Sequence, residues 1–354
     1  MKPVLAGACN YCYGLMDQMS HQFAKTRYDK MQYRRCGRSG LKLPAVSLGA
    51  WETYGGTRDG DVAKECMFRA FDLGITHFDL ANNYGTPPGN AEIVCGNILK
   101  EMPRDELIVS SKAGYLMWPG PYGEWGSRKH IIASCDQSLK RTGLAYFDIF
   151  YSHRPDPNTP LEETIGALDT LVKHGKALYV GVSSYTGAQF EAALEVVHRN
   201  DLAPITIHQP YYNMLGRVVE TDLLPHTDRA GTGVIAFCPL ASGLLSGSKY
   251  LDGDVPADSR PGREWASGWV KSKSKEERKR ILNGLNDLAR ERGQSLAQMS
   301  VAWVLRHKGM VSVAMGASRP EQVEQNVAAL SKLDFTDDEL SRIDALTQAS
   351  PRRS

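Results

Sequence analysis

Four side chains that can carry charge or exchange protons follow short apolar runs in the first half of the chain. Asp79 ends one such run and Tyr84 follows it by five residues, whereas Lys112 and His153 each lie two residues beyond the next two runs. Neighbouring parallel strands bring their carboxyl ends together at one edge, so we expect these four side chains to share one site.

These residue types indicate acid catalysis at a carbonyl oxygen. A free phenol has a pKa of about 10, and a nearby ammonium group lowers that value. We therefore expect Lys112 to lower the pKa of Tyr84, Asp79 to pair with Lys112, and His153 to donate a hydrogen bond to a substrate oxygen. The set includes neither a nucleophile nor a cluster of metal ligands, and no metal site is predicted. It favours carbonyl reduction with a hydride from a nicotinamide cofactor.

The surrounding sequence alternates short apolar runs with helix-length segments, which is typical of the α/β class. A parallel return needs a crossover long enough to hold a helix. Eight such units over about 300 residues favour a closed (β/α)8 TIM barrel over an open doubly wound sheet. The predicted strands are 45–48, 76–79, 107–110, 147–151, 177–182, 205–208, 233–237 and 311–315, and the predicted helices are 61–73, 91–99, 128–141, 161–174, 187–197 and 218–229.

Three further segments frame this repeat. Residues 32–35 and 41–43 flank a Cys-Gly-Arg-Ser-Gly turn and predict an N-terminal β-hairpin that caps the lower mouth of the barrel. A long loop, 240–268, and two extra helices, 275–292 and 296–307, separate strands seven and eight, and a last helix is expected over 337–346. We predict one barrel domain over 31–348, a poorly ordered extension over 1–30, which is either genuine or a mis-assigned start, and a tail over 349–354.

Composition limits the partners. The formal net charge is +2, from 42 basic and 40 acidic side chains, which gives no electrostatic case for nucleic acid or an anionic membrane. No window approaches the roughly 18 apolar residues of a membrane span. The seven cysteines are scattered and odd in number, which suits a reducing compartment. We predict a cytoplasmic protein that binds a small molecule.

Several motifs resemble those of the aldo-keto reductases and follow the same order along the chain as in that family. The resemblance covers the chain from Met31 onward. The motifs are 78–85 (FDLANNYG), 111–114 (SKAG), 151–153 (YSH), 181–184 (GVSS), 208–210 (HQP) and 316–319 (GASR). The resemblance implies that Asp79, Tyr84, Lys112 and His153 form a catalytic tetrad with Tyr84 as the proton donor. It also implies a cofactor across the barrel mouth, held by Trp51, Asp79, Ser183, Gln209, Cys238, Pro239, Leu240, Ser242, Gly243, Lys249, Arg260, Gly316, Ser318, Arg319, Gln322 and Asn326.

The phosphate preference follows partly from local structure. Residues 316–319 join the last strand to a helix whose first amides are unpaired, and Ser318 and Arg319 add donors for a 2'-phosphate. NADPH is therefore the expected cofactor. The related β-subunit branch of the family often has Glu where this chain has Gln325, so an acidic partner for the adenine amino group is replaced by an amide.

Two segments, 112–123 (KAGYLMWPGPYG) and 126–129 (GSRK), look like the L-glyceraldehyde 3-phosphate reductase branch, which is similar to voltage-gated potassium channel β subunits. This resemblance implies reduction of L-glyceraldehyde 3-phosphate, methylglyoxal and other small aldehydes, and a homo-oligomer fits the branch. The expected substrate contacts are Trp51, Tyr54, Tyr84, Trp118, His153 and Arg154. The alternatives are a cofactor-binding regulatory subunit with weak reductase activity, and an isomerase or lyase that uses the same mouth without cofactor.

Overall fold

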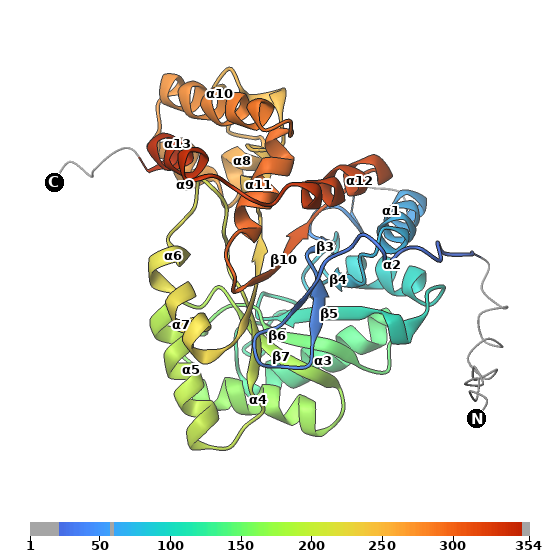
Figure 1. Cartoon of the computed structure of the whole chain (residues 1–354). Coiled ribbons are helices and arrows are strands. Elements are labelled where there is room, and N and C mark those ends of the chain that lie inside the picture. The colour runs from blue at the N-terminus through green and yellow to red at the C-terminus, as the bar shows by residue number, and fades with distance from the viewer. Residues whose placement is uncertain (1–20, 57–59, 349–354) are drawn as a thin grey trace, which may run out of the picture.

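Eight parallel strands close into a barrel in the computed structural model, which describes residues 21–56 and 60–348 (Figure 1). The strand order is β10-β3-β4-β5-β6-β7-β8-β9, so each strand pairs with its neighbour in sequence and β10 closes onto β3. The predicted (β/α)8 barrel is confirmed. The barrel strands are β3 (Val46–Gly49), β4 (His77–Asp79), β5 (Ile108–Ala113), β6 (Phe147–Ser152), β7 (Ala177–Ser183), β8 (Ile205–Gln209), β9 (Gly233–Phe237) and β10 (Met310–Met315).

Helices on the outside of the barrel connect successive strands. They are α1 (Gly60–Asp72), α2 (Asn90–Leu99), α3 (Arg128–Thr142), α4 (Leu161–Lys173), α5 (Gly187–Arg199), α6 (Val219–Asp222) and α7 (Leu224–Ala230). Two further helices, α12 (Pro320–Ala328) and α13 (Asp337–Thr347), follow the last strand. The single helix predicted over 218–229 is wrong, because the structure divides it into α6 and α7. Pro225 lies in the first turn of α7, and its ring and missing N–H interrupt a continuous helix.

The predicted N-terminal hairpin is present and closes the amino-terminal mouth of the barrel. Strands β1 (Tyr33–Arg35) and β2 (Lys42–Pro44) pair antiparallel. Leu41 and Leu43 are buried in a cluster with inward-facing residues of β6, β8 and β9, including Ile149, Ile207 and Ile235. The hairpin therefore seals the end of the barrel interior with an apolar plug.

The long connection between β9 and β10 carries the extra helices that the sequence predicts. It contains η3 (Ala241–Gly243), η4 (Ser248–Tyr250), α8 (Arg260–Arg263), α9 (Ser267–Ser272), α10 (Lys275–Glu291) and α11 (Leu296–Leu305). Capping boxes begin both long helices, at Ser274 for α10 and at Ser295 for α11. Helices α8 to α11 gather on one side of the molecule together with α13 (Figure 1). Among the described residues, no helix is long and apolar enough to cross a membrane.

Part of the predicted N-terminal extension packs on the barrel. The Phe23 ring lies edge-on against Phe68 and Phe71 of α1, at centroid distances of 5.1 and 4.8 Å. The Ala24 amide donates to Asp72, and Arg27 pairs with Glu106. Residues 21–30 therefore cover the surface of α1, whereas residues 1–20 of the extension and the tail 349–354 lie outside the described residues.

Truncating a buried side chain of the hairpin plug should lower the free energy of unfolding without changing ligand binding. Leu43→Ala removes a fully buried side chain, so we expect a loss of about 2–5 kcal/mol in the free energy of unfolding. The matched control Leu178→Ala removes a side chain that is 49% exposed and should cost less than about 1 kcal/mol. Urea denaturation measures both variants. Equal losses would show that the hairpin does not stabilise the barrel.

Candidate active site

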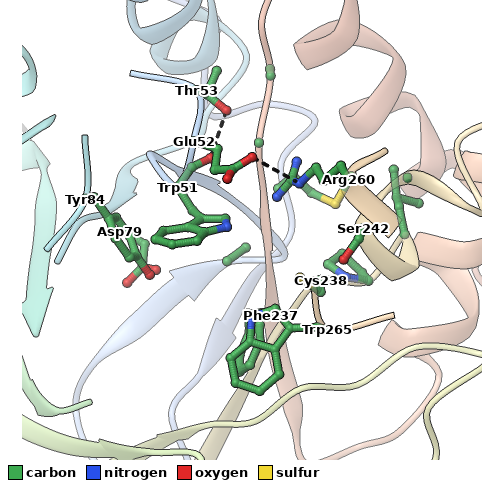
Figure 2. A pocket seen from close by; sticks show the side chains of 18 of the residues that line it. Trp51, Glu52, Thr53, Asp79, Tyr84, Phe237, Cys238, Ser242, Arg260 and Trp265 are labelled. Carbon is green, nitrogen blue, oxygen red and sulfur yellow. Dashed lines mark hydrogen bonds and ion pairs between the residues drawn. The ribbon is translucent and has the colours of Figure 1, made fainter. Parts of the chain in front are cut away.

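A cavity with a volume of about 540 Å³ opens at the carboxyl ends of the barrel strands, opposite the hairpin. In Figure 2, Tyr84 and Asp79 lie on one side of this cavity and Ser242, Cys238 and Arg260 lie on the other. Trp51 lies between these two groups, and Phe237 and Trp265 form a further part of the wall. Carboxyl ends of strands are where barrels of this type place their sites.

Strand register brings the predicted catalytic residues together. Asp79 of β4 is paired in register with Ser110 of β5, so Lys112 lies one inward-facing position further along β5. The turn after β4 then directs Tyr84 back over the barrel. Gly85 makes this turn possible, since its φ is +91° and a Cβ there would lie 2.5 Å from the amide nitrogen of Ala91.

Lys112 is fully buried and its ammonium group has three acceptors. The Nζ atom lies 2.7 Å from Asp79 Oδ2, 2.8 Å from the carbonyl oxygen of Leu80 and 3.3 Å from Tyr84 Oη. An ammonium group has three donors and no acceptor, so the Tyr84 oxygen must accept this bond. The phenolic proton of Tyr84 is then left to donate to another group, and Tyr84 lines the cavity.

The expectation that the pKa of Tyr84 is lowered is wrong. Burial raises the pKa of Tyr84 well above its ordinary value, and the charge of Asp79 adds to this effect. Burial alone would raise the pKa of Asp79, but Lys112 lowers it below its ordinary value. Asp79 is therefore a carboxylate, and Tyr84 holds its proton at neutral pH.

His153 is the fourth member of the group and lines the same cavity. Its ring lies 5.9 Å from the Tyr84 ring and 4.7 Å from the Tyr115 ring, edge-on to both. Burial lowers the pKa of His153 well below its ordinary value, and the charges of Lys112 and Arg154 add to this effect. The imidazole is therefore neutral, and its Nδ1 atom has no hydrogen-bond partner among the described residues.

All but three of the predicted cofactor residues line the cavity. Those that do are Trp51, Asp79, Ser183, Gln209, Cys238, Pro239, Leu240, Ser242, Gly243, Arg260, Gly316, Ser318 and Gln322. Lys249 is exposed beside Tyr250, and Arg319 is exposed at the start of α12. Asn326 is buried further along α12 and does not reach the cavity wall.

The cavity wall fits a polar planar ligand such as a nicotinamide group. Five buried polar atoms on it have no hydrogen-bond partner among the described residues, namely Trp51 Nε1, Asn83 Oδ1, His153 Nδ1, Gln209 Nε2 and Ser242 Oγ. Buried donors without partners are costly, and a bound ligand can satisfy them. The N-terminus of α12, reached through Gly316 and Ser318, offers amides for a phosphate.

The predicted substrate contacts divide into two groups. Trp51, Tyr84 and His153 line the cavity, whereas Tyr54, Trp118 and Arg154 do not. Tyr54 lies in the hydrophobic core, and the Trp118 ring packs 5.0 Å from His130.

Arg154 is held by protein partners close to the cavity. Its guanidinium lies 4.2 Å from the Tyr115 ring centroid and 3.8 Å from that of Trp125, and it is paired with Glu124. The Arg154 guanidinium is therefore already stabilised by two aromatic rings and one carboxylate.

Several wall residues were missed by the sequence reasoning. Trp265, on the long β9–β10 connection, stacks on Tyr211 at 5.9 Å and meets Phe237 edge-on at 5.0 Å. Glu52 follows β3 and lies 3.8 Å from Arg260 across the cavity mouth, as Figure 2 shows. The only sequence signal for these two residues is their position, because Phe237 is the last residue of β9 and Glu52 follows the end of β3. No local sequence signal predicts that Trp265 lines the cavity, because the fold of the long loop determines its position.

Comparison with known proteins agrees with this geometry. Residues 45–348 match the model of the aldo/keto reductase family. Two proteins named L-glyceraldehyde 3-phosphate reductase, from Escherichia coli O157:H7 and from strain K12, are each 53% identical over 324 residues, covering 90% of this chain and 93% of theirs. A probable voltage-gated potassium channel subunit beta from Oryza sativa is 37% identical over 330 residues, covering 92% of this chain and 99% of its own.

The family match covers all eight barrel strands and the four residues Asp79, Tyr84, Lys112 and His153. Members of this family are oxidoreductases that act on small molecules, in general with NADH or NADPH, and the cavity has the donors to hold such a cofactor. The chain belongs to the aldo/keto reductase family.

Proposed function

We propose that this protein reduces small aldehydes with NADPH, with L-glyceraldehyde 3-phosphate and methylglyoxal among its substrates. The observation that carries the proposal is the contact between Lys112 Nζ and Tyr84 Oη, which leaves the phenolic proton free at the cavity wall. The relatives named L-glyceraldehyde 3-phosphate reductase support the substrate class.

A bound nicotinamide cofactor supplies the hydride, and the residues of this chain manage the proton. Tyr84 donates its proton to the carbonyl oxygen as that oxygen becomes negative. Lys112 stabilises the phenolate that Tyr84 leaves behind, since it lies 3.3 Å from Oη. Asp79 keeps Lys112 charged and in place. His153 orients the carbonyl oxygen by a hydrogen bond from its neutral ring.

The polar residues of the cavity wall support one orientation of the bound cofactor. Trp51, Gln209 and Ser242 would hold the carboxamide end with their unsatisfied polar atoms. Ser318 and the N-terminus of α12 would hold a phosphate. Arg319 at the same terminus supplies the charge that favours NADPH over NADH. Lys249 and Asn326 remain proposed contacts that a bound cofactor would reach through movement of the long loop or of α12.

A second function is favoured by the relative from rice, whose name refers to a potassium channel subunit. On that alternative the protein binds cofactor in the same cavity and acts as a regulatory partner with weak reductase activity. The neutral, buried His153 beside Tyr84 favours turnover, because it adds a substrate-orienting donor to the cavity.

Steady-state oxidation of NADPH, with NADH alongside, tests the proposal against L- and D-glyceraldehyde 3-phosphate, methylglyoxal and an aromatic aldehyde. We expect NADPH-selective turnover of the small aldehydes, with the L-phosphate among the best. Tight NADPH binding with negligible turnover of every aldehyde would contradict the proposal and support the regulatory alternative.

Tyr84→Phe tests the proposed proton donor in this assay, and Tyr28→Phe is its control. Tyr84→Phe should lower kcat by about 10²–10⁴-fold and leave the Kd for NADPH nearly unchanged, because only the proton donor is lost. Tyr28→Phe removes a hydroxyl on the segment that packs near Glu106 and should leave kcat unchanged. If Tyr84→Phe retained most of the activity, Tyr84 would not be the proton donor.

The two shifted pKa values predict the pH dependence of reduction. Reduction needs a protonated Tyr84, whose pKa is raised, and a neutral His153, whose pKa is lowered. For an uncharged aldehyde, kcat/KM should therefore stay level between about pH 6 and 8, with no inflection from His153. A loss of activity as pH rises through about 6.5 that is absent from His153→Gln would show that a protonated imidazole is required instead.

A further inference from the structure

We propose that His77 is a positioning residue for the reaction, and that it acts on the Asp79–Lys112–Tyr84 group through Ser110. The proposal rests on the proposed function, in which Tyr84 donates the proton. His77 is the first residue of β4 and lies one inward-facing position below Asp79. It is fully buried within the barrel and does not line the cavity.

A continuous chain of hydrogen bonds joins His77 to the site. His77 Nε2 lies 3.0 Å from Ser110 Oγ, and Ser110 Oγ lies 2.6 Å from Asp79 Oδ1. On the other side, His77 Nδ1 lies 2.8 Å from Ser47 Oγ, which lies 2.6 Å from Ser312 Oγ. The chain therefore crosses β10, β3, β4 and β5 within the barrel interior and ends at the catalytic carboxylate.

The direction of every bond in this chain is fixed by the ionised Asp79. A carboxylate only accepts, so the hydroxyl of Ser110 must donate to it, and the Ser110 oxygen must then accept from His77 Nε2–H. A neutral imidazole with its proton on Nε2 has a bare Nδ1, which accepts from Ser47. Ser47 accepts in turn from Ser312. One tautomer of His77 therefore satisfies the whole chain.

The charge state of His77 agrees with this assignment. Burial lowers the pKa of His77 to about 4, against the attraction of Asp79. A protonated ring would donate from both nitrogens and would force the Ser47 hydroxyl to reverse. The neutral ring therefore locks the chain in one direction across the neutral pH range.

The chain matters to the site because it holds one oxygen of Asp79 while Lys112 holds the other. Asp79 Oδ1 accepts from Ser110 and Oδ2 accepts from Lys112, so the carboxylate plane is set from both sides. The lower part of the barrel interior holds apolar side chains such as Ile149 and Ile235. Loss of the His77 donor should let Ser110 and Asp79 rotate, and the Lys112 ammonium would shift against Tyr84.

Four variants and one control test this role. His77→Leu removes both ring nitrogens, Ser110→Ala removes the link, and the double variant combines the two. His77→Gln is the conservative replacement, since its amide nitrogen can donate to Ser110 while its oxygen accepts from Ser47. His208→Leu is the control, because His208 is also fully buried on a barrel strand but bonds the carbonyl of Tyr185 and has no link to Asp79.

The first readout does not depend on turnover. NMR of the wild-type protein with ¹⁵N-labelled histidine should show His77 as the Nε2–H tautomer at neutral pH. With ¹³C-labelled tyrosine, the Tyr84 resonance should move in His77→Leu and in Ser110→Ala, return in His77→Gln, and stay unchanged in His208→Leu. An Nδ1–H or charged His77, or a Tyr84 resonance that His77→Leu leaves unmoved, would overturn the proposal whether or not the protein reduces aldehydes.

The second readout is kinetic. His77→Leu should lower kcat roughly tenfold with KM and the Kd for NADPH unchanged. A loss of this size corresponds to one hydrogen bond, here the bond that holds Ser110 against Asp79. Because His77 acts through Ser110, the double variant should be no slower than Ser110→Ala alone. Multiplied losses in the double variant would contradict the route through Ser110. If the wild-type protein turns over no aldehyde, the proposed function fails, and the NMR results decide the positioning role alone.

Discussion

The burial of one ammonium group is the constraint on which the rest of the site depends. Lys112 has no exposed surface, so its charge must be matched within the protein. Asp79 neutralises it, the Leu80 carbonyl takes a second donor, and the Tyr84 oxygen takes the third. Since all three donors are used, the phenol is left with one direction for its proton. The geometry of the proposed catalytic site is therefore a consequence of satisfying a buried cation.

The barrel provides the conditions for this burial. Parallel register places Asp79 and Lys112 on adjacent strands with both side chains inward. The hairpin plug closes the amino-terminal mouth and keeps water from the polar layer beneath the site. At the other mouth, the long β9–β10 connection supplies Arg260 and Trp265 to the wall of the cavity. One end of the barrel thus provides stability and the other provides ligand contacts.

Much of this architecture could be predicted from the sequence, because each strand is a short apolar run followed by polar residues. All eight barrel strands and the residues at their ends follow from that pattern. The split between α6 and α7 has a local cause in Pro225, which a sequence interpretation can include. The place of Trp265 could not be predicted, because it depends on the tertiary packing of a long loop without periodicity.

The electrostatic expectation failed for a physical reason that only the fold reveals. The sequence predicts that Lys112 lies near Tyr84 and pairs with Asp79, but it does not show that Lys112 and Tyr84 are both buried. Burial of the phenol and the carboxylate beside it together raise the pKa of Tyr84. Tyr84 is therefore a phenol that holds its proton, and in the proposed reaction the effect of Lys112 belongs to the step in which the phenolate forms.

The central claim is tested most directly by single-turnover hydride transfer in a variant that carries Asp79→Asn together with Lys112→Met, which removes both buried charges at once. Stopped-flow fluorescence of NADPH measures binding and transfer in the same experiment. We expect that NADPH still binds, while transfer to an aldehyde slows by more than about 10²-fold, because the developing phenolate loses its cation. Transfer at nearly the wild-type rate would show that the buried ion pair serves the fold alone.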